Sequence, residues 1–265
     1  MFDYHVHSVF SADCEEPMEK SVQRAIALGL QEICFTEHID YDYPDPTIVF
    51  DLDLSAYTRK MTSLQKQYGE QITIKKGVEI GVQPHLLDRY RQLIAQETFD
   101  FVICSMHTAH QQDLHSGAFF AEKSVDEAFA AYYRELLYCV KSYKKYQILG
   151  HLDLVKRYTR EIPTNDFHDI IREIFRVIIA DGKGIELNTS GVRYGLANGL
   201  PSEDILELYK ECGGEIITLG SDSHQAETIA FQFQESLQLL KHLGYRYITT
   251  FTKGEAQQHP IEEII

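Results

Sequence analysis

Long apolar runs are absent from the 265-residue chain, and none approaches the ~20 residues needed to span a bilayer. The first ten residues, MFDYHVHSVF, have neither the basic nor the apolar segment of a secretory signal peptide. Cysteine is also scarce, with five residues and no C-x-x-C pair, which argues against a disulfide framework or a cysteine zinc site. These absences predict a cytoplasmic protein with no membrane partner.

Positive charge is in short supply. The chain has 25 Lys and Arg against 40 Asp and Glu, which gives a formal net charge of -15. A net negative charge of this size creates an electrostatic field that repels nucleic acid and anionic membranes, so we expect no nucleic-acid partner. An anionic substrate would need local positive charge from metal ions or from a few basic side chains.

What the chain does have is an alternation of strand-like and helix-like segments. The short β-branched or aromatic runs cover residues 2–6, 32–36, 72–78, 99–105, 146–150, 183–188 and 215–220, with a weaker run at 245–250. Helical patterns cover 17–28, 124–143, 166–180, a segment opening at 201, and 226–243. Seven or eight such units in about this length predict parallel strands in an α/β barrel.

The boundaries of these segments carry local signals. Gly29 follows the first helical pattern as a C′ glycine, and Ser124 and Glu127 have the spacing of a capping box. No linker or low-complexity tract interrupts the chain, which predicts a single domain over 1–265. The acidic, proline-containing segment 40–54 is predicted to be an active-site loop on the barrel rim.

Side chains that bind metal ions stand at the ends of six predicted strands. In chain order they are His5 and His7, Glu37 and His38, Glu79, His107, His151, and Asp222 and His224. Because the carboxyl ends of barrel strands meet on one face, these residues are expected to converge in one cavity. One strand-end histidine occurs easily by chance, whereas six strand ends of this kind do not.

The spacing of these residues fits metal binding. His5 and His7 are two apart, as are Asp222 and His224, so each pair points to one side of an extended strand. Neutral imidazole and carboxylate are ligands of zinc, manganese and iron. The set exceeds what one ion can bind, so two or three ions sharing a bridging carboxylate are predicted.

The remaining histidines lack this placement. His168 and His242 fall within helical patterns and are interpreted as non-ligands, like His85 and His259. His110 and His115 follow the fourth strand in a loop, so they stay marginal candidates for substrate contact.

Seven short motifs run in order along almost the whole chain. They are His5-Val6-His7, Ser11-Ala12-Asp13, Phe35-Thr36-Glu37-His38, Gly77-Val78-Glu79, Ser105-Met106-His107, Gly150-His151 and Gly220-Ser221-Asp222-Ser223-His224. Together they resemble the polymerase-and-histidinol-phosphatase (PHP) family. The segment 185–191 and the chain length resemble its monofunctional histidinol-phosphate phosphatases more than its polymerase-attached domains.

The resemblance implies a distorted (β/α)7 TIM-like barrel with three divalent metal ions (Zn, Mn or Fe) at the C-terminal ends of the strands. The implied ligands are His5, His7, Glu79 and Asp222 for the first ion, Glu79, His107 and His151 for the second, and Asp13, His38 and His224 for the third. Some relatives have histidine at the position of Asp13, which leaves the metal identity open.

Residue chemistry leads to the same mechanism class. A water shared by two metal ions would lose a proton near neutral pH and attack phosphorus, while the ions offset the phosphate charge. The leaving alkoxide would take its proton from water, Asp222 or His224, and the sequence leaves the three open.

A phosphate monoester needs further cations. The candidates are Lys156, Arg157 and Arg160 after the fifth strand and Arg193 after the sixth. We favour Arg160 and Arg193, while Lys156 and Arg157 could equally be surface charges. Asp40, Asp42 and Asp45 could complement a cationic substrate, although a solvated acidic loop is the preferred interpretation.

The resemblance implies hydrolysis of L-histidinol phosphate in histidine biosynthesis. The alternatives are a PHP phosphoesterase acting on another phosphorylated metabolite or on phosphotyrosine, an amidohydrolase, and a non-catalytic metal-binding module. Glu79 argues against an amidohydrolase, which typically uses lysine as the bridge, and the intact ligand set argues against the module. The oligomeric state is not readable from the sequence.

Overall fold

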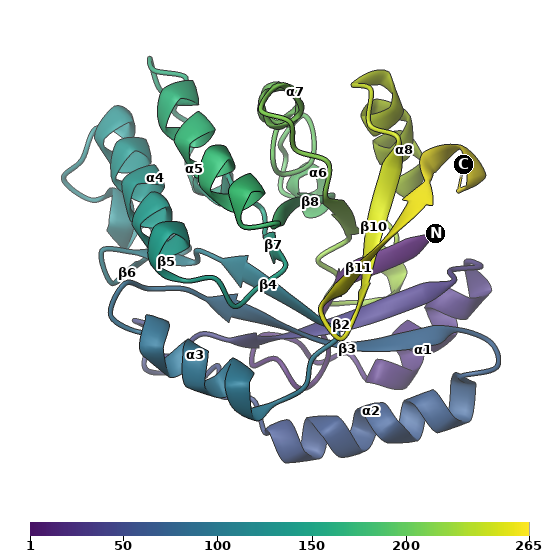
Figure 1. The fold of residues 1–265 in the computed structure, drawn as a ribbon. Helices are drawn as coiled ribbons and strands as arrows, with labels where there is room; N and C mark the ends of the chain where they lie inside the picture. Colours follow the sequence, from purple (N-terminus) through teal and green to yellow (C-terminus); the bar gives the residue numbers. More distant parts are fainter. Residues whose placement is uncertain (265) are drawn as a thin grey trace.

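The computed structural model describes residues 1–264 and places seven parallel strands in one sheet that curls into a nearly closed barrel (Figure 1). The strand order is β1-β2-β3-β4-β7-β8-β9. These strands are β1 (Phe2–Val6), β2 (Glu32–Ile39), β3 (Thr73–Gly81), β4 (Phe101–Ser105), β7 (Ile148–Leu149), β8 (Gly184–Asn188) and β9 (Ile217–Gly220). The predicted distorted (β/α)7 TIM-like barrel is confirmed.

Helices surround the sheet and pack their apolar faces against it (Figure 1). The α-helices are α1 (Met18–Ala27), α2 (Leu54–Tyr68), α3 (Leu87–Gln96), α4 (Val125–Ser142), α5 (His168–Ala180), α6 (Ser190–Arg193), α7 (Glu203–Glu211) and α8 (Phe233–His242). Short 3-10 turns are η1 (Ala118–Phe120), η2 (Leu154–Tyr158), η3 (Ala226–Thr228) and η4 (Ile261–Glu263).

Two helix ends follow the sequence signals. Helix α1 ends just before Gly29, whose φ of 73° lies in the left-handed region that glycine adopts readily. The capping box of α4 is complete, because Ser124 accepts a hydrogen bond from the Glu127 N–H and Glu127 accepts one from the Ser124 N–H.

Helices α2 and α3 have no counterpart among the predicted segments. Helix α2 buries Tyr57, Met61, Leu64 and Tyr68, a spacing of four, three and four residues, and Asp53 caps its N-terminus. The helical period is therefore present in the sequence.

The predicted helix over 226–243 is wrong in its first half. The chain forms the turn η3, and α8 begins only at Phe233, because Ala230 and Gln232 have φ values of 54°. The backbone N–H of Ala230 donates to Asp3 Oδ2 at 2.9 Å, and that of Ala226 donates to Glu16 Oε2 at 3.0 Å. These tertiary hydrogen bonds replace the helical ones.

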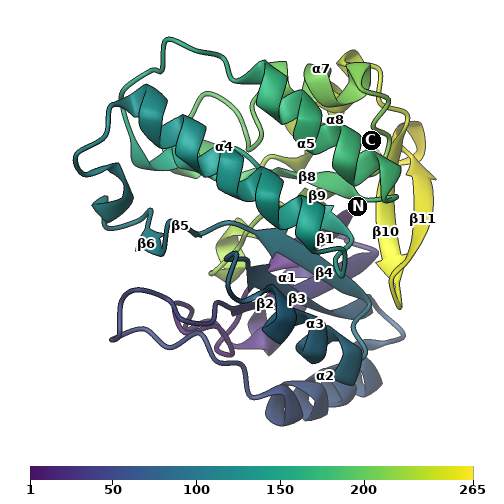
Figure 2. The same cartoon turned by 60° about the vertical axis from the view of Figure 1, so that its left-hand side comes forward.

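The eighth predicted strand, 245–250, lies outside the barrel sheet. It forms β10 (Tyr247–Thr252), which pairs antiparallel with β11 (Glu255–Pro260). This hairpin lies at the amino ends of the barrel strands, because Phe251 stacks on Phe101 at the start of β4 and bonds through its backbone to the Tyr4 hydroxyl. Figure 2 shows the hairpin at one end of the barrel and the short pair β5 (Thr108–Ala109) and β6 (Gln112–Asp113) at the other.

The barrel closes between its first and last strands. An isolated parallel bridge pairs Val6 with Ser223, through hydrogen bonds from the His7 N–H to Ser223 O at 2.9 Å and from the Ser223 N–H to His5 O at 3.3 Å. The buried Asp3 carboxylate accepts from the Ser221 N–H at 3.0 Å. The seam thus forms beside the histidines of β1.

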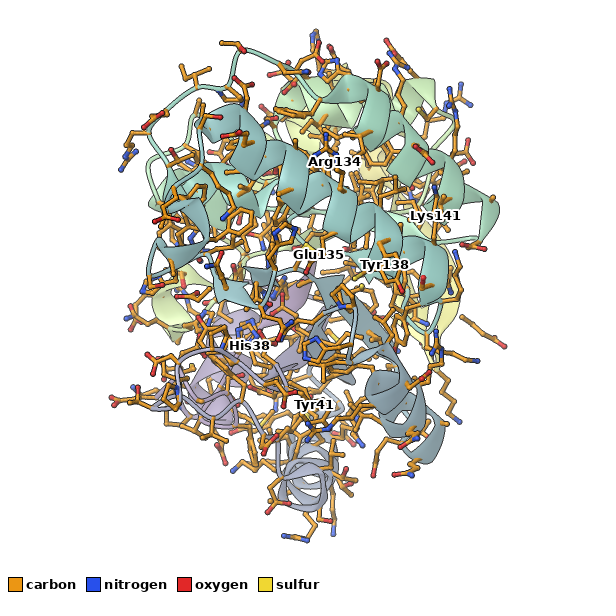
Figure 3. The ribbon with its side chains drawn as sticks, turned by 90° about the vertical axis from the view of Figure 1, so that its left-hand side faces the viewer. His38, Tyr41, Arg134, Glu135, Tyr138 and Lys141 are labelled. Atoms are coloured by element: carbon orange, nitrogen blue, oxygen red, sulfur yellow. The ribbon has the colours of Figure 1, made fainter. Side chains whose placement is uncertain are left out.

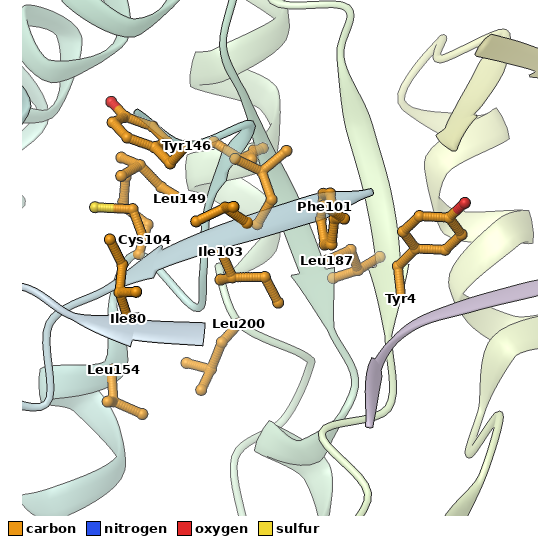
Figure 4. Packing of buried hydrophobic residues seen from close by; sticks show 14 of the residues in the cluster. Tyr4, Ile80, Phe101, Ile103, Cys104, Tyr146, Leu149, Leu154, Leu187 and Leu200 are labelled. Carbon is orange, nitrogen blue, oxygen red and sulfur yellow. The ribbon is translucent and has the colours of Figure 1, made fainter. Parts of the chain in front are cut away.

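Buried apolar side chains fill the space around the sheet. Figure 4 shows Phe101, Ile103 and Cys104 of β4 among side chains from neighbouring strands. Within residues 1–264, no helix combines the length and apolar character that crossing a membrane requires.

Candidate active site

Glu79 lies at the centre of a cluster of imidazoles. Its carboxylate, fully buried near the end of β3, lies 3.0–3.4 Å from one ring nitrogen of each of five histidines. These histidines are His5 (β1), His7 (after β1), His38 (β2), His107 (after β4) and His151 (after β7). In-register pairing of β2 with β3 sets His38 directly opposite Glu79. The strand ends thus converge as the sequence predicts.

Two further carboxylates complete the cluster. Asp222, after β9, has Oδ1 at 3.8 Å from His5 Nε2 and 3.6 Å from His7 Nε2. Asp13 Oδ2 lies between His38 and His224, at 3.7 and 3.4 Å from their Nε2 atoms. The structure therefore brings together all nine residues of the predicted ligand set.

Ligand-type atoms gather in four overlapping groups, within each of which they lie no more than 4.8 Å apart. The groups are His5–His7–Asp222, His5–Glu79–His151, His38–Glu79–His107 and His7–His38–His224. They share His5, His7, His38 and Glu79, which is the arrangement expected where neighbouring ions share ligands.

The buried polar atoms of the cluster fit a metal-bound state. His7 Nε2 and His38 Nδ1 are buried and have no hydrogen-bond partner among residues 1–264. Leaving such atoms unsatisfied costs about 1–3 kcal/mol each. An ion coordinated by these nitrogens would remove that cost, so the donor set suits zinc, manganese or iron.

The surroundings shift the pKa values of the imidazoles in different directions. Burial disfavours the charged form of each ring, yet Glu186 and Glu79 hold the pKa of His5 well above its usual value. Asp40 and Glu79 act in the same way on His107. For His7, burial and the neighbouring His38 and His224 lower the pKa well below its usual value. His7 is therefore neutral and able to coordinate.

Several histidines have a polar partner on the nitrogen that points away from the cluster. His107 Nδ1 lies 2.5 Å from Asp40 Oδ2, and His7 Nδ1 lies 3.2 Å from Ser11 Oγ, which itself donates to Glu37. Such partners fix the ring orientation and tautomer and leave Nε2 for an ion. Sequence reasoning missed these roles, because Glu37 was grouped with the ligand types and Asp40 with the loop.

A cavity of about 340 Å³ opens above the cluster. The predicted loop 40–54 supplies part of its wall, with Phe50 in an edge contact with the His38 ring. The lining residues outside the cluster are Asp40, Tyr43, Ile48, Phe50, Asp113, His115, Leu154, Arg157, Tyr158 and Tyr194. This volume suits a small metabolite.

The four candidate phosphate-binding cations lie in different places. Arg157 lines the cavity, with its guanidinium 3.1 Å from the centre of the Tyr194 ring and 3.8 Å from Asp222 Oδ2. Arg193 lies behind it and donates to the backbone oxygen of Asp222 at 2.8 Å. Lys156 pairs with Asp153 at 2.9 Å and donates to Ser202, and Arg160 is exposed outside the cavity lining.

His110 and His115, the two marginal candidates for substrate contact, also lie in different places. His115 lines the cavity, whereas His110 is half exposed and bonded to Glu135 of α4. Figure 3 labels Glu135 on that helix, together with the half-exposed Tyr138. His168 pairs with Asp204 at the surface, in agreement with its interpretation as a non-ligand.

Of the three acidic candidates in the loop 40–54, only one lines the cavity. Asp40 lines the cavity, while Asp42 lies beside Arg89 and Asp45 bonds within its own turn to Thr47. An acidic contact that sequence reasoning missed is Asp113 in the cavity wall, which accepts a hydrogen bond from Tyr43 at 2.8 Å. Only the fold brings residues 43 and 113 together, so no sequence signal marked this pair.

The chain resembles known proteins along nearly its full length. Residues 3–190 match the PHP domain family model. A histidinol-phosphatase of Lactococcus lactis is 36% identical over 94% of both chains, and one of Bacillus subtilis is 22% identical over 89% of this chain and 98% of that one.

Solved structures agree with this result. The L. lactis histidinol phosphate phosphatase, complexed with zinc, L-histidinol and phosphate, matches with a TM-score of 0.87 and 34% identity, over 97% of this chain and 98% of that one. A structure of the metal-dependent tyrosine phosphatases of B. subtilis and Streptococcus pneumoniae matches with a TM-score of 0.51 and 16% identity, over 91% of this chain and 87% of that one. The second match shows a shared fold alone. By its motifs, its barrel and its relatives, the chain belongs to the PHP domain family.

Proposed function

We propose that this protein hydrolyses L-histidinol phosphate to L-histidinol and phosphate. The observation that carries the proposal is the cluster of five imidazoles around Glu79, which lies at the base of a cavity with an arginine in its wall. Histidine biosynthesis is the pathway that this reaction serves. The relatives named histidinol-phosphatase support the choice of substrate.

The proposed metal ligands are the nine residues of the cluster, holding three divalent ions. The proposed sets are His5, His7, Glu79 and Asp222 for one ion, Glu79, His107 and His151 for a second, and Asp13, His38 and His224 for a third. When bound, such ions activate water near neutral pH and offset the charge of the phosphate. Zinc is the first candidate, because it is bound in the L. lactis structure.

The chain's own side chains would bind and orient the substrate. Arg157 presents a planar guanidinium to the phosphate oxygens, and stacking on Tyr194 holds that plane. Asp40 and Asp113 face the opposite charge of the amine or imidazole of histidinol. The proton for the leaving oxygen would come from water, Asp222 or His224, all at the base of the cavity.

Residues 1–265 are proposed to act as one catalytic domain, since the proposed ligands run from residue 5 to residue 224. The proposed location is the cytoplasm, which suits a chain in which all five cysteines are free.

The test is phosphate release from L-histidinol phosphate by the purified protein, before and after chelation and after zinc or manganese is added back. We expect turnover that chelation removes and metal restores. Turnover that survives complete removal of metal would contradict the proposed site.

A second candidate is a phosphoesterase for another metabolite or for phosphotyrosine. The aromatic wall of the cavity, with Tyr43, Phe50, Tyr158 and Tyr194, would also accept a phenyl ring. A panel of phosphomonoesters that includes phosphotyrosine distinguishes the two. Higher kcat/KM on phosphotyrosine than on histidinol phosphate would favour this candidate.

A further inference from the structure

Strand β8 differs from the other six barrel strands, because neither it nor the turn after it supplies a proposed metal ligand. It ends in Glu186-Leu187-Asn188, and Glu186 and Asn188 are buried on the side that faces the cluster. A fully buried carboxylate is costly unless it is paired, so its partners indicate what it does.

The Glu186 carboxylate contacts two proposed ligands from different strands. Its Oε2 lies 2.9 Å from His5 Nδ1, and its Oε1 accepts from the His151 backbone N–H at 2.7 Å. Asn188 Nδ2 donates to the same Oε1 at 3.0 Å. Among residues 1–264, no lysine or arginine pairs with Glu186, and His5 is its ionic partner.

Two glycines leave room for this carboxylate. A Cβ at position 220 would lie 2.7 Å from Glu186 Oε2 and 2.5 Å from His5 Cβ. A Cβ at position 150 would lie 3.3 Å from Glu186 Oε1. Gly150 directly follows β7 and belongs to the motif Gly150-His151, and Gly220 ends β9 and belongs to the motif Gly220-Ser221-Asp222. Both strands are neighbours of β8 in the sheet. A side chain at position 220 would displace this carboxylate, whereas one at position 150 would first meet Ser105 Oγ and Ile103 Cγ2.

We propose that Glu186 is a positioning residue that prepares two of the metal sites together. Its Oε2 accepts the Nδ1 proton of His5, which leaves His5 Nε2, 3.1 Å from Glu79 Oε2, free to coordinate. Its Oε1 holds the backbone turn that presents the His151 ring to Glu79 Oε1 at 3.0 Å. The inference rests on the metal site of the proposed function.

The proposed site that contains Asp13 gives an internal contrast. His38 and His224, with Asp13, make no contact with Glu186. An effect of Glu186 should therefore fall on the sites that contain His5 and His151 and spare the one that contains Asp13.

The experiment is zinc titration of the metal-free full-length protein against a chromophoric chelator, comparing wild type with Glu186→Gln. Glutamine keeps the shape but has one acceptor oxygen for three N–H donors, one at Oε2 and two at Oε1, so its amide NH2 must face His5 Nδ1 or the His151 N–H. We expect the Kd of the affected zinc ions to rise about 10- to 100-fold, the range for losing such a partner, with at least one ion per chain bound as in wild type.

The control is Asp100→Asn. Asp100 also accepts backbone N–H groups, from Lys76 and Lys253, but at the amino end of the barrel and without an imidazole partner. It should lower thermal stability without changing zinc affinity. Circular dichroism of both metal-free variants establishes that they are folded.

Unchanged zinc affinity in folded Glu186→Gln would overturn the inference, as would equal weakening of every ion. If Glu186→Gln does not fold, Glu186→Asp, which keeps the charge but retracts the carboxylate, and Gly220→Ala are titrated with the same expectation. Failure of wild type itself to bind zinc would contradict the proposed function, whereas tight zinc binding by wild type and Glu186→Gln alike would contradict only the role of Glu186.

Discussion

At the scale of single residues, the chemistry depends on how many imidazoles reach one carboxylate. His107 is the proposed ligand with the most accessible ring among the five around Glu79, and it contacts both Glu79 and Asp40. We expect His107→Ala to lower kcat/KM for histidinol phosphate by more than about 100-fold, since losing a ligand should cost more than losing a ligand's partner. Phosphate release measures the effect.

The matched control is His110→Ala, which removes the same side chain from a half-exposed site bonded to Glu135. It should retain nearly all activity. Wild-type turnover in His107→Ala would refute the metal cluster as the seat of the reaction.

Arg157 and Arg160 differ by three positions in the chain but differ greatly in surroundings. Arg157 lines the cavity against Tyr194, whereas Arg160 is exposed. We expect Arg157→Ala to lower kcat/KM by roughly 10- to 100-fold, the equivalent of about 1.5–3 kcal/mol for a hydrogen bond to a charged group. Arg160→Ala should change it less than about threefold by the same scale. Steady-state kinetics of both variants measures the two losses. A larger loss of kcat/KM in Arg160→Ala than in Arg157→Ala would indicate that Arg160 binds the phosphate.

Sequence reasoning reached eight of the nine proposed ligands because strand ends converge in any barrel of this type, whereas Asp13, between β1 and α1, came only from the family resemblance. It could not order the four basic candidates, because the short elements η2 and α6, which carry Lys156, Arg157 and Arg193, have no strong pattern that tells which side chain faces inward. It also missed Glu186, since a buried carboxylate two residues before a strand end carries no pattern of its own.

At the scale of elements, α4 offers a clean test of a local signal. Its capping box is complete and lies at the surface. The box is at the N-terminus of the helix, whereas Ser142 is at the C-terminus. We expect Ser124→Ala to lower the free energy of unfolding by about 0.5–2 kcal/mol, because the backbone N–H of Glu127 loses its side-chain acceptor. Thermal or urea unfolding measures the loss, and kcat should stay unchanged.

Ser142→Ala is the control, since it makes the same change in the same helix at a hydroxyl with no hydrogen bond to another residue of 1–264. Its stability should match wild type to within about 0.5 kcal/mol, as for most surface changes. An equal loss of unfolding free energy in both variants would show that the capping box does not stabilise the helix.

The elements that were predicted and those that were missed differ in how locally they are determined. Helix α1 and the start of α4 follow from capping signals and apolar period within one segment. The hairpin β10–β11 and the break before α8 depend on contacts with Phe101, Tyr4 and Asp3, which are distant in the chain. Local pattern alone could not have excluded an eighth barrel strand.

At the scale of the whole molecule, the fold buries the cysteines unequally. Burial raises the pKa of the Cys14 thiol to about 12 and holds those of Cys34 and Cys104 well above their usual value, so the reactive thiolate is suppressed. Cys212 is partly exposed. We expect one thiol per chain to react quickly with a disulfide reagent at pH 8, and all five to react in denaturant.

Cys212→Ser should remove the fast phase and leave the slow one. Two or more fast thiols in the native wild type would mean that the barrel opens more readily than its packing indicates.

The bridge between Val6 and Ser223 joins the first barrel strand to the last, beside the residues that would hold the metal. During synthesis, His5 and His7 leave the ribosome first, and Asp222 and His224 follow only after the six other strands of the barrel sheet. A growing chain therefore presents isolated histidines but never the whole proposed ligand set. On this proposed assignment, a complete metal site can form only after β9 and the turn that follows it have been synthesised.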